Sequence, residues 1–104
     1  MLSEDLRKKI TSCLDAAFRE RLRGVLLYGS EARNEARAES DVDLMVLLDG
    51  PVQLGRDLDT IVGALYPIQL EIDAPIHATP VSADAFEAGE WGVYRNARRE
   101  GVLL

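Results

Sequence analysis

The sequence lacks the features that mark secreted and membrane proteins. It contains one cysteine, Cys13, so no disulfide bond can form within the chain. No apolar run approaches the length of a membrane span, and the N-terminus shows no secretory signal. We therefore expect a cytoplasmic protein with no membrane contact.

Positive charge is also scarce. The chain has 12 lysine and arginine residues against 18 aspartate and glutamate residues, which gives a net charge of -6. General nucleic-acid binders draw much of their affinity from lysine and arginine that neutralise phosphates, so polynucleotide is disfavoured as the main partner. A length of 104 residues leaves room for one domain, residues 1–104, with a single core and no separate substrate-binding domain.

Two short apolar runs with polar residues at their ends organise the chain. Val25–Tyr28 is an apolar run that ends at Gly29 and Ser30, which indicates a buried strand followed by a sharp turn. Glycine permits such a turn, and Ser30 is a suitable N-cap for a short helix after it. Free backbone N–H groups at a helix start favour phosphate. This turn is therefore a candidate phosphate-binding site.

The second run, Leu44–Leu48, is preceded by two aspartates. Asp41 and Asp43 are two residues apart at the start of a predicted strand, so both carboxylates should emerge on one face. Mg²⁺ in proteins is held by a few carboxylates together with waters and substrate phosphates. The two runs together therefore predict a site for Mg²⁺ and a nucleoside triphosphate.

The segments Gly29-Ser30-Glu31-Ala32-Arg33 and Ser40-Asp41-Val42-Asp43-Leu44 carry a resemblance to a known family. Their pattern resembles the signature of the nucleotidyltransferase superfamily related to DNA polymerase β, in its minimal (MNT) branch. The family usually has glycine after the arginine, where this chain has Asn34, which also tolerates a left-handed backbone. The resemblance implies an α/β (α+β) palm: a small mixed sheet of three to four strands flanked by helices.

The rest of the chain predicts the elements around this centre. Apolar spacing predicts a first helix over Ser3–Leu22, capped by Ser3 and broken by Gly24. It predicts a second helix over Gln53–Tyr66, stopped by Pro67. Alternation over Ile68–Val81 predicts a strand with one buried face, at an edge or bent because prolines interrupt it. A further helix begins after Ser82, and whether the apolar C-terminal residues cover the sheet or a partner stays open.

The remaining site residues follow from the resemblance. The family commonly has a third metal-facing carboxylate on the strand after the second helix, and Asp73 is our choice for it, with Glu71 as the alternative. Arg33 is preferred to Arg37 as a triphosphate contact, because it lies within the motif. His77 has a suitable pKa range for a general base but is left out of the predicted catalytic set, as an ordinary surface histidine on an edge strand.

The resemblance also implies a reaction and a partner. Minimal proteins of this kind are often antitoxins of HEPN-domain toxins, and some transfer AMP from ATP to a tyrosine of the toxin. We therefore expect AMP transfer from ATP, with one or two Mg²⁺ ions, to a hydroxyl of a partner protein. Two alternatives stay open: a binding module with a vestigial nucleotide pocket, and transfer to a small molecule across a homodimer.

Overall fold

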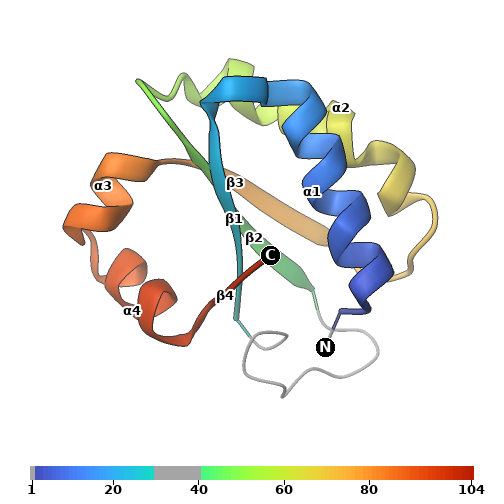
Figure 1. Ribbon diagram of the computed structural model, residues 1–104. Coiled ribbons are helices and arrows are strands. Elements are labelled where there is room, and N and C mark those ends of the chain that lie inside the picture. Colours follow the sequence, from blue (N-terminus) through green and yellow to red (C-terminus); the bar gives the residue numbers. More distant parts are fainter. Residues whose placement is uncertain (1, 30–40) are drawn as a thin grey trace.

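The computed structural model describes residues 2–29 and 41–104 of the protein (Figure 1). Its elements follow one another in this order: α1 (Glu4–Phe18), the 3₁₀ turn η1 (Arg19–Arg21), β1 (Leu22–Tyr28), β2 (Val42–Leu48), α2 (Leu54–Gln69), β3 (Ile76–Ser82), α3 (Ala83–Ala88), α4 (Gly92–Glu100) and β4 (Val102–Leu103). Within these described ranges, no helix has the length and apolar character needed to cross a membrane.

The strands form one mixed sheet in the order β3-β2-β1-β4. β1 pairs antiparallel with β2 and with β4, whereas β2 and β3 run parallel. Helices α1 and α2 lie on one side of this sheet, and α3 and α4 lie on the other (Figure 1). The predicted α/β (α+β) fold with a small mixed sheet flanked by helices is therefore confirmed.

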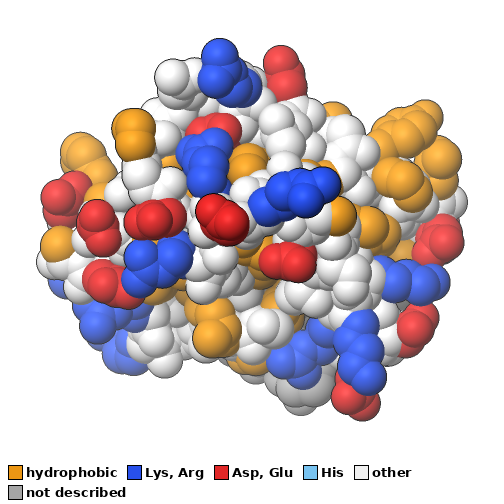
Figure 2. Space-filling view, turned by 45° about the horizontal axis from the view of Figure 1, so that its top comes forward, with side chains coloured by type: hydrophobic (Ala, Val, Ile, Leu, Met, Phe, Trp, Pro, Cys, Tyr) orange, Lys and Arg blue, Asp and Glu red, His pale blue; other side chains and the backbone are white. Residues whose placement is uncertain are grey.

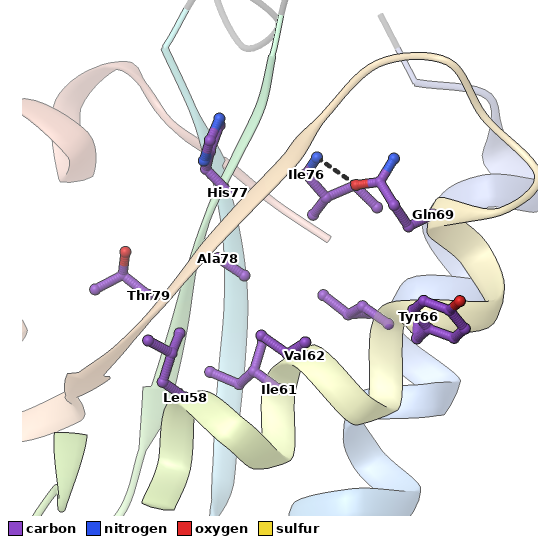
Figure 3. A pocket seen from close by; sticks show the side chains of 10 residues that line it. Leu58, Ile61, Val62, Tyr66, Gln69, Ile76, His77, Ala78 and Thr79 are labelled. Carbon is purple, nitrogen blue, oxygen red and sulfur yellow. Dashed lines mark hydrogen bonds between the residues drawn. The ribbon is translucent and has the colours of Figure 1, made fainter. Parts of the chain in front are cut away.

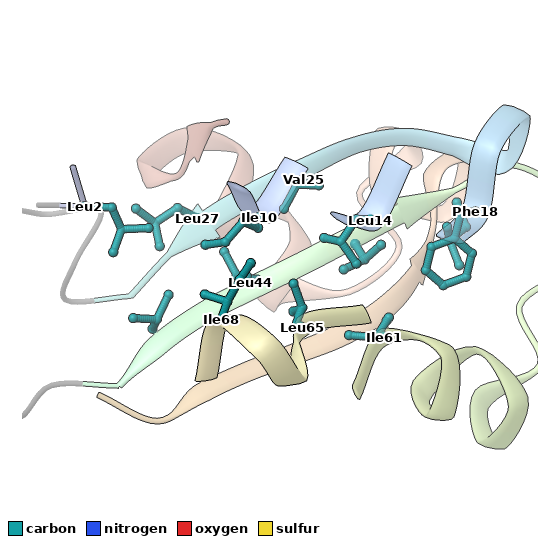
Figure 4. Packing of buried hydrophobic residues seen from close by; sticks show 13 residues of the cluster. Leu2, Ile10, Leu14, Phe18, Val25, Leu27, Leu44, Ile61, Leu65 and Ile68 are labelled. Carbon is teal, nitrogen blue, oxygen red and sulfur yellow. The ribbon is translucent and has the colours of Figure 1, made fainter. Parts of the chain in front are cut away.

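The central strand β2 is buried on both faces. Its residues Leu44, Val46 and Leu48 join side chains of α1 and α2 in the larger core (Figure 4). Met45 and Leu47 point to the other face and pack with side chains of α3 and α4. Because side chains alternate along a strand, Asp43 belongs to the α3–α4 face.

The first helix begins as predicted but ends earlier. The Ser3 hydroxyl accepts a hydrogen bond of 3.1 Å from the backbone N–H of Leu6, which confirms the N-cap. The helix stops at Phe18, since Arg19 has a positive φ of 54° and opens the 3₁₀ turn. Gly24 does not break the helix: it lies inside β1, whose pairing with β2 already begins at Leu22.

The second helix continues past the residue predicted to stop it. α2 runs through Pro67 to Gln69, because a proline in the last turn removes only one intrahelical hydrogen bond and Ile68 is still buried in the core. The Gln69 side chain then crosses the following turn: its amide donates to the Ala74 carbonyl at 2.9 Å and accepts from the Ile76 N–H at 2.8 Å. The strand predicted over Ile68–Val81 therefore begins only at Ile76.

The end of the sheet remote from the β1–β2 loop is fixed by one buried carboxylate. Asp57 is 1% exposed, and its carboxylate accepts hydrogen bonds from both terminal nitrogens of Arg21, at 2.9 and 3.1 Å. It also accepts the backbone N–H of Gln53 at 2.9 Å, just before the first turn of α2. Arg21 therefore joins the start of β1 to the start of α2.

Candidate active site

The two aspartates of the motif lie at the N-terminal end of β2. Asp43 is the second residue of the strand, and Asp41 comes directly before it. Asp43 is half-buried on the α3–α4 face, whereas Asp41 is 48% exposed. The pairing with β1 sets Asp43 opposite Tyr28, the last residue of that strand. The carboxylates therefore stand beside the point where β1 ends.

Gly29 makes the close approach at this point possible. It has a positive φ of 79°, a conformation that glycine adopts without strain. A β-carbon at this position would lie 2.7 Å from Oδ2 of Asp43. The Asp43 carboxylate therefore packs directly against the backbone of the turn. The positive φ of Gly29 agrees with the predicted turn after β1, whose second residue, Ser30, lies outside the described residues.

The site concentrates negative charge. Burial raises the pKa of Asp43, the neighbouring Asp41 carboxylate raises it further, and His77 opposes the shift. Burial and the Asp43 charge likewise raise the pKa of the Tyr28 hydroxyl. The contributions of the Asp41 and Asp43 carboxylates to these shifts show negative charge that a bound cation would offset. Proteins usually provide one or two carboxylate ligands to Mg²⁺, while phosphates and waters supply the others, so two carboxylates are sufficient here.

The predicted phosphate-binding residues cannot be placed beside these carboxylates. Ser30 and Arg33 lie outside the described residues, as do Asn34 and Arg37. The contacts of Ser30 and Arg33 with a triphosphate stay predictions. What the structure adds is the position of Gly29, directly after β1 and against the Asp43 carboxylate.

The prediction that Asp73 lies on the third strand is wrong. Asp73 is an exposed residue of the turn before β3, and no hydrogen bond or ion pair joins it to another residue within 2–29 and 41–104. Glu71, the alternative, lies in the same turn and forms an ion pair of 3.2 Å with Lys9 of α1. The structure thus brings neither side chain to Asp41 or Asp43, and the metal role of Asp73 stays a prediction.

His77 is the side chain of β3 that reaches the aspartates. The parallel register pairs His77 with Asp43, and the His77 Nε2 atom lies 3.0 Å from Oδ2 of Asp41. The alternation that assigned His77 to the polar face of the strand was the available signal for this contact. Sequence alone did not supply the register that brings His77, and not Asp73, opposite Asp43.

A hollow of about 390 Å³ lies between α2 and β3, at the open edge of the sheet (Figure 3). Its walls are mostly apolar: Leu58, Ile61, Val62, Leu65, Tyr66, Gln69, Ile76, His77, Ala78 and Thr79. Figure 3 shows Ile76 on the side of β3 that faces α2, and His77 on the opposite side. His77 thus lines the edge of this hollow and also contacts Asp41.

The hollow continues onto an exposed apolar surface of α2. We call this surface the α2 stripe; its residues are Leu54, Leu58, Val62 and Tyr66. A spacing of four residues puts them on one helix face, and Val62 and Tyr66 are each 59% exposed. Figure 2 shows acidic and basic side chains interspersed over one view of the molecule, with hydrophobic side chains gathered at its right, where α2 lies in Figure 1.

A smaller hollow of about 170 Å³ lies on the α3–α4 face beside the turn. Tyr28 and Gly29 line one side of it, and residues of α4, including Asn96 and Ala97, line the other. The Asp43 carboxylate touches Gly29 at its margin. Space for a small ligand group therefore exists next to the turn and the carboxylate.

Known proteins are similar to this chain in sequence and in fold. Residues 8–88 match the sequence profile of the family described as "Polymerase beta, Nucleotidyltransferase". The chain is 28% identical over 105 residues to a Methanocaldococcus jannaschii protein named "Putative protein adenylyltransferase MJ0604", covering 100% of this chain and 99% of that one. A crystal structure described as "a putative nucleotidyltransferase from Sulfolobus solfataricus" superposes with a TM-score of 0.67 at 18% identity, over 95% of this chain and 76% of that one.

The family match spans the elements that build the site, from α1 through β1, β2 and β3 to α3. It includes the turn at Gly29 and the carboxylates at Asp41 and Asp43. The fold of the Sulfolobus solfataricus protein agrees with this assignment. The chain belongs to the polymerase β-type nucleotidyltransferase family.

Proposed function

We propose that this protein transfers AMP from ATP to a hydroxyl group of a partner protein. The observation that carries the proposal is the packing of the Asp43 carboxylate against the Gly29 turn, with Asp41 beside it. This arrangement supports the proposal because it sets two carboxylates, suited to Mg²⁺, next to Gly29, where the proposed phosphate-binding segment begins. Membership of the nucleotidyltransferase family supports the reaction class.

The reaction requires positive charge beside the α-phosphate of ATP, to offset the negative charge of the phosphate oxygens. The acceptor hydroxyl attacks the α-phosphorus of ATP and loses its proton to solvent, a new P–O bond forms, and the bond from that phosphorus to the bridging oxygen of the β-phosphate breaks with release of pyrophosphate. Mg²⁺ held by Asp41 and Asp43 would supply the positive charge that offsets the phosphate charges. Gly29 admits the close approach of backbone and carboxylate, and Ser30 and Arg33 are proposed to hold the outer phosphates.

Two observations favour a protein as the acceptor. The similar protein from Methanocaldococcus jannaschii, which matches along nearly its whole length, carries a name that specifies protein adenylylation. In addition, the α2 stripe leaves large apolar side chains exposed next to the hollow that His77 borders. Exposed apolar surface of this kind is typical of protein-binding sites. We propose that a HEPN-type toxin is the partner and that this chain acts as its antitoxin.

A second candidate is a binding module that neutralises the same partner without transferring a nucleotide. The observation that favours it is the composition of the site: within residues 2–29 and 41–104, no three histidine, cysteine, aspartate or glutamate side chains converge as a ready metal site. Mg²⁺ needs only one or two carboxylates when substrate phosphates complete its shell, so catalysis remains our first candidate.

The test is direct transfer. The protein is incubated with α-labelled ATP, Mg²⁺ and the product of the adjacent gene, and the partner is analysed by mass spectrometry for the addition of one AMP. We expect labelling by the wild type and none by Asp41→Asn or Asp43→Asn. Asp59→Asn, which changes an exposed acid on α2, is the matched control and should label normally.

Three outcomes separate the candidates. Unchanged labelling in both site variants would exclude the proposed metal roles. A tight complex with the partner, but no labelling with any of the four nucleoside triphosphates, would favour the binding module. Labelling of a small molecule by a homodimer, with no labelled partner, would indicate a different acceptor class.

A further inference from the structure

The register of the sheet brings His77 to the aspartate pair. β3 runs parallel to β2 and pairs His77 with Asp43, so both side chains emerge on one face. The His77 Nε2 atom lies 3.0 Å from Oδ2 of Asp41. These three residues therefore lie at the beginnings of two neighbouring strands, at one end of the sheet, and His77 contacts Asp41.

The contact with His77 is the polar contact that the described residues give the Asp41 side chain. This side chain is 48% exposed, so packing does not hold it in one rotamer. Among the residues that the structure describes, only His77 forms an ion pair or hydrogen bond with the Asp41 carboxylate. Asp43 is different, because it is half-buried and rests on Gly29. Within the described residues, one of the two proposed metal ligands is thus held by packing, and the other by its contact with the His77 ring.

We propose that His77 is a positioning residue of the nucleotidyl-transfer site, whose ring N–H holds Asp41 so that this carboxylate and Asp43 bind one divalent ion. The inference deepens the proposed function and rests on it. A histidine or other polar group that holds a carboxylate ligand fixes its direction and reduces the conformational freedom lost on metal binding. His77 supplies no negative charge. The remaining negatively charged ligands of the metal are therefore the phosphate oxygens of the substrate.

The contact geometry favours this role over direct metal ligation. The His77 Nε2 atom is already directed at an oxygen of Asp41. No three potential ligand side chains within residues 2–29 and 41–104 converge on a common point at metal-binding distance. A ring that bonded the metal through the same nitrogen would have to release Asp41. His77 therefore acts on the metal through Asp41.

The test measures metal binding, not catalysis. Mn²⁺ is titrated into the protein in the presence of α,β-methylene-ATP. In this analogue a methylene group replaces the oxygen between the α- and β-phosphorus atoms, so nucleotidyl transfer cannot occur. Free Mn²⁺ is followed by electron paramagnetic resonance. We expect His77→Ala to weaken Mn²⁺ binding about tenfold or more. His77→Gln should recover most of the affinity, because its amide N–H reaches the place of Nε2.

Thr79→Ala is the matched control, since Thr79 is an exposed residue two positions along β3, on the same face. It should bind Mn²⁺ as the wild type does. Circular dichroism and thermal unfolding check that each variant is folded, which we expect because the His77 side chain is 61% exposed.

The outcomes separate this role from the proposed function. Equal Mn²⁺ affinity in the wild type and His77→Ala would overturn the positioning role, as would a His77→Gln variant as weak as His77→Ala. Nitrogen coupling to bound Mn²⁺ in pulsed spectra, lost in His77→Ala, would overturn it in favour of direct ligation. A wild type that binds no Mn²⁺ with the nucleotide would instead overturn the proposed function, and the role of His77 with it.

Discussion

The Oδ2 atom of Asp43 fills the space that a β-carbon at Gly29 would need, since that carbon would lie 2.7 Å from it. Gly29, directly after β1, and Asp43, the second residue of β2, are thus fitted to each other. Glycine is therefore needed at this position for two reasons. It adopts the positive φ without strain, and any larger residue would displace the Asp43 carboxylate.

We predict that Gly29→Ala weakens the binding of metal and nucleotide and also destabilises the fold. The positive φ of 79° alone costs an alanine about 1–2 kcal/mol, and the displaced carboxylate removes a metal ligand. Gly50→Ala is the matched control, because Gly50 has a φ of 78° but a β-carbon there would meet nothing within 4 Å. Urea unfolding should show losses in both variants, whereas Mn²⁺ titration should show a loss only in Gly29→Ala. Equal metal affinity in the two variants would contradict the prediction.

We predict that Asp43→Asn stabilises the metal-free protein. Burial and the Asp41 charge raise the Asp43 pKa above the unfolded value of about 3.9, so the folded chain holds this proton more tightly. The contribution of Asp43 to the free energy of unfolding therefore falls as pH rises through the folded pKa. Removing the charge should raise that free energy by about 0.5–1 kcal/mol near neutral pH.

The measurement for Asp43→Asn is thermal unfolding in a chelator, repeated with Mg²⁺ and ATP. Ligands that bind only the folded state stabilise it, so the wild type should gain stability on their addition. Asp43→Asn should gain little, and the order of the two melting temperatures should reverse. If the variant melts below the wild type in chelator, the Asp43 charge is not a stability cost.

We predict that Asp57→Ala is strongly destabilising. Asp57 is 1% exposed, and it is held by Arg21 and by the backbone N–H of Gln53. Removing one partner of a buried ion pair costs about 3–5 kcal/mol, and because Arg21 retains partial exposure we expect about 3 kcal/mol. Urea unfolding at neutral pH measures the loss.

The same carboxylate gives a pH dependence of opposite sign to that of Asp43. The hydrogen bonds from Arg21 hold the Asp57 pKa below its ordinary value, despite burial. Its stabilisation is therefore present above the unfolded pKa of about 3.9 and is lost as pH falls through the folded value. In Asp57→Ala this part of the acid transition should disappear. The exposed pair Arg23–Asp49, at 3.3 Å, is the control, and Asp49→Asn should change stability by less than about 1 kcal/mol.

The fold was largely readable from local patterns. Both predicted apolar runs, Val25–Tyr28 and Leu44–Leu48, lie within strands, although β1 already begins at Leu22 and β2 at Val42. The helix boundaries were less readable. Pro67 looks like a stop signal, but the last turn of α2 tolerates it because Ile68 is still buried. The short β4, whose Val102 and Leu103 pair with β1, carried no pattern that distinguished it from a partner-binding tail.

The sequence predicted only those parts of the site that a single short segment determines. The turn at Gly29 and the spacing of Asp41 and Asp43 are local properties, and the structure contains both. The residue opposite Asp43 depends on where β3 begins, which in turn depends on the Gln69 side chain that spans the preceding turn. Alternation gave Asp73 and His77 the same face, so sequence could not choose between them.

We predict that the α2 stripe binds the acceptor protein. Val62 and Tyr66 are each 59% exposed, so Val62→Ser and Tyr66→Ser should change the free energy of unfolding by less than about 0.5 kcal/mol. Loss of buried apolar contact should weaken binding of the partner in calorimetric titrations, by about tenfold or more if either residue is central to the interface. Leu103→Gln is the control, because Leu103 is 63% exposed at the opposite edge of the sheet and its change should leave the affinity intact. If the stripe variants bind the partner normally but turn a wild-type dimer into a monomer in sedimentation, the stripe joins two copies of this chain and the acceptor binds elsewhere.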